Sequence, residues 1–294
     1  MLDLHLHVWP HQAGTSVPGL DTLERYCEAA ANKGISQIAI TEHSHRFVPV
    51  VETVLPHWDR PRSGPVADAT AYVLDVEGGA DLDAYVQALI DAQDAGLPLL
   101  IGLEVDYLPG AMDAMADLLG EYPFDVLLGS VHWLDDWLFD AYGTPAFAVR
   151  WEERDTDEVF AQYVDSVLDL ASSGVVDVLA HLDVIKVAGH MPSRLAEHEQ
   201  RLVDGLSTLT DEEHRLAIEF SSAGLRKPVA DTYPSSSLLD ALLDAGVLLT
   251  TASDGHTVEQ VGTGFDVLKR ALHRRGVETL TSFDRRRPVP HQLL

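Results

Sequence analysis

Histidine and carboxylate side chains occur in this sequence at spacings that suit metal binding. The chain has 14 histidines among its 294 residues. His5 and His7 are separated by a single residue, and one glycine separates Asp254 from His256. Imidazole nitrogens and carboxylate oxygens are common ligands of zinc, manganese and iron in proteins. Further candidates of the same chemical types are His43, Glu104, His132 and His181.

Short apolar runs alternate along the chain with segments in which apolar residues recur at helical spacing. This alternation is typical of βαβ units and a parallel sheet. We expect strands at 2–8, 36–41, 99–104, 125–131, 175–180, 216–220 and 247–252. We expect helices at 20–32, 82–95, 111–119, 159–172, 237–245 and 258–273. The pattern predicts an α/β fold with seven such units, which suggests a closed or nearly closed barrel, with a doubly wound open sheet as the alternative.

The candidate ligands fall where the predicted strands end, and in a parallel barrel these ends all open onto one face. Alternate residues of a strand point the same way, so His5 and His7 can bind one ion from a single strand. Gly255 permits a tight bend through which Asp254 and His256 can address two different ions. A single histidine after a strand is more often an ordinary loop or core residue. So many strand ends carrying ligand types together predict a multinuclear metal site.

Two segments interrupt the alternation of a chain that we otherwise expect to form one domain over residues 1–294. Residues 44–80 contain several prolines, and residues 133–155 are rich in aromatic side chains such as Trp133 and Trp137. Long insertions in a compact domain are often lids or binding loops. The aromatic residues of the second insertion predict a packed lid.

The charge balance excludes several classes of partner. Lys and Arg total 20 against 47 Asp and Glu, giving a net charge of −27, which repels the phosphate backbone of nucleic acids. The basic stretch 285–287 is therefore expected to pair within the molecule. We find no apolar run long enough for a membrane span and no basic, apolar leader, and the single cysteine cannot form an internal disulfide. We expect a cytoplasmic enzyme with a small-molecule partner, either a monomer or a homodimer.

The sequence resembles the PHP (polymerase and histidinol phosphatase) superfamily, and within it the histidinol-phosphatase branch. The motifs that carry the resemblance are DLHLH (3–7), ITEHS (40–44), GLEVDY (102–107), GSVH (129–132), AHLDVIK (180–186), EFSSAGLRK (219–227) and SDGH (253–256). The resemblance implies a distorted (β/α)7 barrel, TIM-like, with three divalent ions. Sets of histidine and carboxylate ligands accept zinc, manganese or iron. The resemblance places His5, His7, Glu104 and Asp254 on one ion. A second ion shares Glu104 with His132 and His181, and a third takes His11, His43 and His256.

Few basic residues are available to bind a phosphate group, since the chain has only four lysines. Arg226 is expected to contact the phosphate, because its guanidinium group offers bidentate hydrogen bonds. Further expected substrate contacts are Lys186, Lys227, Ser130, Ser222 and Asp106, with Asp106 meeting the ammonium group of histidinol phosphate. His45 is a further candidate.

Three further residues are expected either to support the metal ligands or to have no role in the site. Glu42 is expected to orient His43, and Asp183 to orient His181, since metal-bound imidazoles commonly need such partners. His198 is expected on an exposed helix surface, where replacement by alanine is nearly silent.

The implied reaction is the hydrolysis of L-histidinol phosphate, a step of histidine biosynthesis. Two ions bridged by Glu104 would activate a water molecule, and Arg226 would offset the charge of the transition state. A metal-bound water, His256 or Asp254 would protonate the leaving group. The alternatives are a PHP enzyme acting on another small phosphate monoester or nucleotide, a proofreading nuclease, and a binding protein with a degenerate barrel.

Overall fold

A parallel barrel sheet organises the chain. The computed structural model describes residues 1–294 except 11–15, 210–215 and 294. Its seven-stranded sheet has the order β1-β2-β3-β4-β7-β8-β9. The strands are β1 (Leu2–Leu6), β2 (Gln37–Ile40), β3 (Leu99–Asp106), β4 (Val126–Ser130), β7 (Val178–Leu179), β8 (Ala217–Ser221) and β9 (Leu248–Ala252). Each pairs in parallel with the next. The predicted barrel is confirmed, although the fifth strand is much shorter than the expected 175–180.

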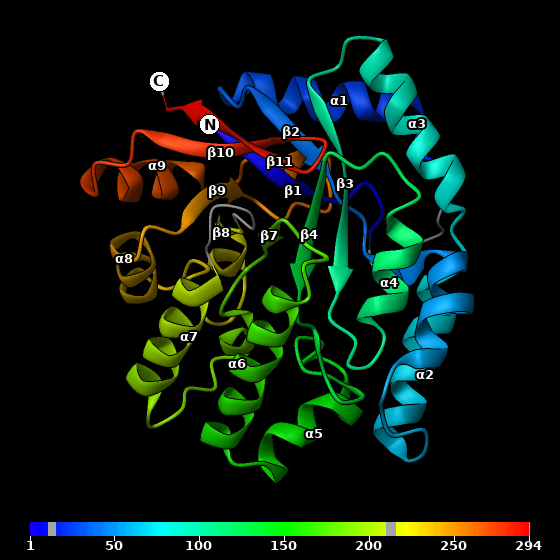
Figure 1. Ribbon diagram of the computed structural model, residues 1–294, viewed down its shortest axis with the longest axis vertical. Coiled ribbons are helices and arrows are strands. Elements are labelled where there is room, and N and C mark those ends of the chain that lie inside the picture. The colour runs from blue at the N-terminus through cyan, green and yellow to red at the C-terminus, as the bar shows by residue number, and fades with distance from the viewer. Residues whose placement is uncertain (11–15, 210–215, 294) are drawn as a thin grey trace.

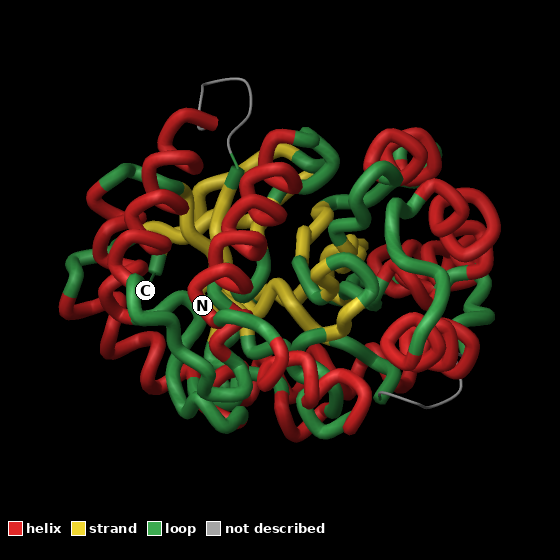
Figure 2. The backbone as a smooth tube through the Cα atoms, turned by 90° about the horizontal axis from the view of Figure 1, so that it is seen from below, coloured by secondary structure: helices red, strands yellow, loops and turns green. Residues whose placement is uncertain are grey.

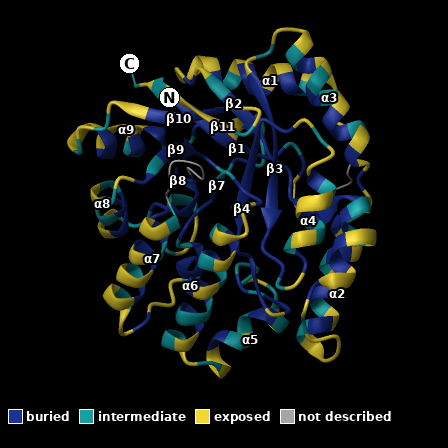
Figure 3. Cartoon of the chain, viewed as in Figure 1, coloured by how far each residue is buried: buried dark blue, intermediate teal, exposed yellow. Residues whose placement is uncertain are grey.

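The first and last strands lie side by side and nearly close the barrel. The amide nitrogen of His7 donates to the carbonyl oxygen of Gly255 at 2.8 Å, and Thr251 Oγ1 donates to the carbonyl oxygen of Leu2 at 2.6 Å. Helices surround the strands, as Figure 2 shows. Strands covered in this way are buried on both faces, which is why their sequences read as continuous apolar runs. Figure 3 shows the burial of the strands.

The helices cover the outside of the barrel with one apolar face each. They are α1 (Leu20–Asn32), α3 (Leu82–Asp94), α4 (Met112–Leu119), α6 (Thr156–Ser172), α7 (Leu195–Leu209), α8 (Ser236–Asp244) and α9 (Phe265–Arg274). Side chains of Asp81, Asp155 and Ser235 cap the first turns of α3, α6 and α8. No helix among the described residues is long and apolar enough to cross a lipid bilayer.

Two helix predictions need correction. The expected helix 258–273 is a short 3-10 turn, Val258–Gln260, followed by α9. Gly262 and Gly264 separate them with φ angles of 61° and 82°, a left-handed backbone that no α-helix continues through. Helix α7 was not predicted, although its buried Leu202 and Leu206 are four residues apart.

The two insertions fold against each other near the carboxyl ends of the strands. The first contains 3-10 turns at Ser44–Arg46 and Leu55–His57, a π-helical turn at Val50–Val54, and α2 (Pro65–Glu77). The second contains a short hairpin, β5 (Trp133–Leu134) and β6 (Trp137–Leu138), and α5 (Pro145–Glu153). The Trp58 and Trp133 rings meet edge to face at 5.6 Å, and Thr70 Oγ1 donates to the carbonyl oxygen of Asp136. The aromatic residues of the second insertion are indeed packed.

A C-terminal hairpin, which the sequence analysis missed, lies at the opposite end of the barrel. Strands β10 (Thr279–Asp284) and β11 (Arg287–Gln292) pair antiparallel. In Figure 1, β3 and β4 point away from this hairpin, so it lies near the amino ends of the strands. Arg286 pairs there with Asp177, Nε to Oδ2 at 3.1 Å, in agreement with the expectation that the basic stretch pairs within the molecule.

Candidate metal centre

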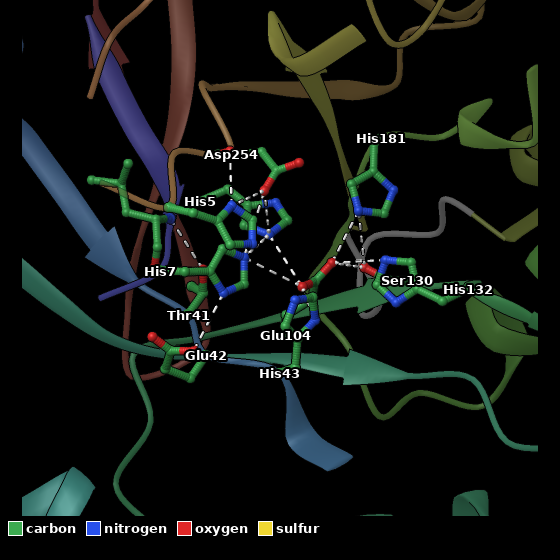
Figure 4. Close-up of polar contacts among 12 residues, drawn as sticks. His5, His7, Thr41, Glu42, His43, Glu104, Ser130, His132, His181 and Asp254 are labelled. Carbon is green, nitrogen blue, oxygen red and sulfur yellow. Dashed lines mark hydrogen bonds and ion pairs between the residues drawn. The ribbon is translucent and has the colours of Figure 1, made fainter. Parts of the chain in front are cut away.

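The predicted ligands converge at the carboxyl end of the barrel. His5 lies in β1 and Glu104 in β3, and the others follow the ends of β1, β2, β4, β7 and β9 (Figure 4). The structure brings together eight of the predicted ligands: His5, His7, His43, Glu104, His132, His181, Asp254 and His256. His11, the remaining predicted ligand, lies outside the described residues.

His5 and His7 point to the same place, as their spacing predicted. Their Nε2 atoms are 3.1 Å apart, and these atoms lie 3.4 and 3.5 Å from Glu104 Oε2. Asp254 Oδ1 is 3.6 Å from His7 Nε2. Both rings are fully buried. Burial lowers the pKa of His7 to about 3, so this ring is neutral and offers its lone pair.

Glu104 lies at the centre and reaches two groups of histidines with its two oxygens. Oε1 is 2.9 Å from His181 Nε2 and 3.5 Å from His132 Nε2. Oε2 is 2.7 Å from His43 Nδ1. Burial alone would raise the pKa of Glu104, but the surrounding imidazoles hold it well below its ordinary value. The carboxylate is therefore ionised and placed to bridge two sites.

A third group forms on the other side of His7. Its ring stacks between those of His43 and His256, with centroid separations of 4.4 and 4.2 Å. One nitrogen from each of these three rings lies within 4.8 Å of the others. The same spacing holds for three further sets of three: His5 with His7 and Asp254, His5 with Glu104 and His181, and His43 with Asp106 and His132.

The chemistry of this donor set fits divalent cations. The Nε2 atoms of His5 and His7 face each other while their Nδ1 atoms face the carboxylates of Glu219 and Glu42, so two Nε2 lone pairs meet unless a proton or a cation lies between them. Buried carboxylates within the same few ångströms need positive charge nearby. Ions coordinated by these nitrogens and oxygens satisfy both requirements. The residues present can therefore hold metal ions between the strand ends.

Carboxylates behind the cluster face the outward nitrogens of three rings and form hydrogen bonds with two of them, those of His5 and His132. Glu219 Oε2 is 2.7 Å from His5 Nδ1, Asp106 Oδ1 is 2.8 Å from His132 Nδ1, and Glu42 Oε2 is 3.5 Å from His7 Nδ1. Such contacts set the tautomer of a ligating imidazole and aim its other nitrogen at the metal. Glu219 was not among the site residues expected from the sequence, although a glutamate inside an apolar strand could have indicated a role in the site.

Both expected orienting pairs, Glu42 with His43 and Asp183 with His181, differ in the structure. Glu42 contacts His7 instead of His43, and its Oε1 accepts hydrogen bonds from the amides of Val8 and Trp9 at 2.6 and 2.8 Å. Asp183 does not contact His181. Its Oδ2 lies 2.8 Å from Lys186 Nζ and accepts a hydrogen bond from the amide of Ser235 at 2.9 Å.

The placement of Asp106 argues against the expected ammonium contact. The side chain is completely buried and accepts hydrogen bonds from Ser44 Oγ, His45 Nδ1 and His132 Nδ1 at 3.0, 2.9 and 2.8 Å. Although burial opposes ionisation, these histidines lower the pKa of Asp106 to about 2. Asp106 thus positions His132, and His45, which lines a cavity together with His43 and His132, is held between Asp106 and Glu77.

Lys186, Ser130 and Ser222 were also expected to contact substrate, but each of them has hydrogen-bond partners within the protein. Lys186 Nζ donates to Asp231 Oδ2 and the carbonyl oxygen of Thr232 at 2.7 and 2.9 Å, beside its pairing with Asp183. Ser222 Oγ donates to the carbonyl oxygen of Thr263 at 2.5 Å. Ser130 Oγ donates to Glu104 Oε1, so it supports the central carboxylate.

Arg226 and Lys227 remain candidates for phosphate contact. Arg226 Nη2 donates to the carbonyl oxygens of Ser253 and Asp254 at 2.7 and 2.9 Å, which fixes the loop that carries Asp254. Its Nη1 is buried and has no hydrogen-bond partner among the described residues. Lys227 is exposed and lines a cavity of about 500 Å³ together with His43 and His132. This cavity leads to the metal centre.

His198, expected on an exposed surface, is buried between helices instead. Only 7% of the residue is exposed, and its Nε2 lies 3.1 Å from Asp157 Oδ1. Replacing it would remove a packed side chain and leave Asp157 without this contact. His273 on α9 is exposed and is the better neutral position.

Comparison with known proteins agrees with this geometry. The model of the PHP domain matches residues 3–223. The chain belongs to the PHP domain family. A probable histidinol-phosphatase of Deinococcus radiodurans is 30% identical over 286 residues, covering 96% of each chain. One of Schizosaccharomyces pombe is 23% identical over 197 residues, covering 64% of this chain and 63% of the relative.

Two solved structures share the PHP fold of this chain. The histidinol phosphate phosphatase of Lactococcus lactis, solved with zinc, L-histidinol and phosphate, matches with a TM-score of 0.70 at 18% identity, over 98% of each chain. A putative histidinol phosphatase of Listeria monocytogenes matches with a TM-score of 0.68 at 16% identity, over 91% of this chain and 99% of that one. At 18% and 16% sequence identity, this similarity shows a shared fold.

Proposed function

We propose that this PHP protein is a metal-dependent phosphatase that hydrolyses L-histidinol phosphate to L-histidinol and phosphate, a step of histidine biosynthesis. The observation that carries the proposal is the convergence of imidazoles on both oxygens of the buried Glu104. The names of the two curated relatives support the choice of substrate.

The residue groups support a centre of three divalent ions of zinc, manganese or iron. We assign His5, His7, Glu104 and Asp254 to one ion, and Glu104, His132 and His181 to a second. His43 and His256 hold the third, with His11 as a further ligand. Bound there, such ions activate water and neutralise phosphoryl oxygens.

The chain's own residues position and polarise the reactants around that centre. Glu104 stays ionised and keeps the two groups of ligands at a fixed separation. Glu219 and Asp106 hold His5 and His132 in one tautomer, so that these rings do not turn during the reaction. Arg226, whose buried Nη1 has no hydrogen-bond partner among the described residues, is expected to turn toward a phosphoryl oxygen, where a charged hydrogen bond would offset negative charge developing in the transition state. Lys227 adds positive charge at the cavity.

A substrate panel tests the proposed function. The purified protein, supplied in turn with zinc, manganese or iron, is assayed for phosphate release from L-histidinol phosphate, p-nitrophenyl phosphate, glycerol phosphate and nucleoside monophosphates. We expect the highest kcat/KM for L-histidinol phosphate. A higher kcat/KM for p-nitrophenyl phosphate or a nucleotide under the same metal and pH conditions would falsify the substrate assignment.

A further inference from the structure

The cavity at the metal centre has a wall made by the second insertion. His43 and His132 line its inner end, and residues 138 and 140–144 line it from the insertion. Its side chains include the ionisable groups Glu77, Asp140 and Lys227, and the aromatic groups Trp133 and Tyr142. A substrate that reaches the metal ligands through this cavity must pass these groups.

The two carboxylates of this cavity differ in their contacts. Glu77 Oε2 lies 3.3 Å from both Arg46 Nη2 and His45 Nε2, so its charge is already compensated. Asp140 is half-buried, and its side chain makes no hydrogen bond or ion pair with another described residue. It lines the same cavity as His43 and His132, which places it near the predicted metal ligands. A partly buried carboxylate of this kind is stabilised when a cation binds next to it.

The backbone holds Asp140 in place. The preceding residue, Phe139, is fully buried, and its amide donates to the carbonyl oxygen of His132 at 3.3 Å. The Phe139 ring packs edge to face against Tyr163 at 5.7 Å. The main chain next to Asp140 is therefore tied to a predicted metal ligand, which fixes the position from which the Asp140 side chain reaches the cavity.

The cation that suits Asp140 is organic. None of the sets of described residues that could hold a metal ion includes Asp140. The aromatic side chains of Trp133 and Tyr142 share the cavity, and they favour a ligand with a flat or apolar body.

We propose that Asp140 is a specificity-determining residue that binds the ammonium group of an amino-alcohol phosphate while the phosphate lies at the metal centre. This inference rests on the proposed function and names the group that distinguishes its substrate from other monoesters. It gives Asp140 the contact that the sequence had suggested for the fully buried Asp106.

Asp140→Asn tests this assignment, because it removes the charge and keeps the shape. We measure kcat/KM for L-histidinol phosphate and for p-nitrophenyl phosphate, which has no ammonium group. The ratio of the two values is expected to fall ten- to hundredfold in the variant, the usual effect of losing a charged hydrogen-bond partner. The fall should appear mainly in KM, and calorimetry should show L-histidinol binding weakened by a similar factor. Asp135→Asn, at an exposed position of the same insertion, should leave the ratio within about twofold of the wild-type value.

The outcomes separate this inference from the proposed function. If the ratio is unchanged in Asp140→Asn, or if both substrates lose equally, the role of Asp140 is overturned. If the wild-type enzyme prefers an ester without an ammonium group, the proposed function fails. Asp140 is still tested in that case, because its removal should selectively weaken those esters in the panel that carry an ammonium group.

Discussion

The two ends of the barrel use buried carboxylates in opposite ways. At the amino end, Asp177 Oδ2 accepts a hydrogen bond from the amide of Leu127 at 2.8 Å and pairs with Arg286. Asp125 Oδ2 accepts from Gln93 Nε2 and the amide of Ile101 at 2.7 and 3.0 Å. These charges are matched by donors from neighbouring strands, from helix α3 and from the C-terminal hairpin, and they join these elements together.

At the carboxyl end, the carboxylates face imidazoles whose nitrogens also face one another. Glu104 and Asp254 lie among histidine rings with no lysine or arginine side chain paired to them among the described residues. Like groups gathered in this way weaken the fold unless a cation joins them. The difference indicates that the amino end contributes stability and that the carboxyl end is arranged for ligands.

Among the substitutions that test this difference between the two ends of the barrel, Glu104→Gln should have the largest effect on activity. The substitution keeps the shape and removes the charge that both groups of histidines share. We expect kcat to fall by at least about a hundredfold, with little change in the circular dichroism spectrum. His273→Ala, at an exposed position of α9, is the control and should match wild type. Similar turnover in the two variants would show that the centre is wrongly assigned.

Arg226→Ala should lower kcat/KM for every phosphate monoester alike, by roughly ten- to hundredfold, because it removes a charged donor that meets the phosphoryl group. The measurement is the set of rates across the substrate panel. A loss confined to L-histidinol phosphate would mean that Arg226 recognises the alcohol part of the substrate instead.

Glu219→Gln should weaken metal binding, since the Nδ1 atom of His5 loses its charged partner. Loss of such a partner typically costs ten- to hundredfold in metal affinity. Competition with a chelator of known affinity measures the change, and excess metal should restore most of the activity. If the metal affinity of the variant is unaltered, Glu219 does not support the metal site.

Arg286→Ala should show the reverse signature and the smallest effect on catalysis. It removes the Arg286–Asp177 pair and a hydrogen bond to the carbonyl oxygen of Val175. We expect a loss of about 1 kcal/mol in the free energy of unfolding, which corresponds to a Tm lower by about 2–4 °C. Activity below the unfolding transition should stay within about twofold of wild type. A large loss of activity there would contradict the division between the two ends.

The sequence predicted the barrel and the convergence of the ligands because both depend on local patterns. Parallel strands with covering helices leave a characteristic alternation, and residues at their carboxyl ends must meet. Prediction from the sequence failed where contacts between distant elements decide which partner a side chain has. Asp106 faces His45 and His132, and Lys186 is neutralised by Asp183 and Asp231. Asp183 is only three residues before Lys186, but the spacing of the other partners in the sequence does not reveal their pairings.

The division between the barrel ends also explains what was missed. In the C-terminal hairpin, the amide of Arg286 donates to the carbonyl oxygen of Asp125, and the Arg286 side chain pairs with the carboxylate of Asp177. Both aspartates precede strands and gave no sign of this partner in the sequence. Glu219 was overlooked because it lies within an apolar strand, and its partner His5 is 214 residues away. Asp140 could be found only once the second insertion was placed against the metal centre.

The central claim is that the carboxyl end of the barrel holds several metal ions that are required for catalysis. Elemental analysis of the purified enzyme, on the same sample that is assayed for phosphate release, tests it most directly. We predict more than one ion per chain, and we predict that chelation abolishes activity and lowers the Tm, because ions that bind only the folded state stabilise it. A fully active sample with at most one ion per chain would contradict the account.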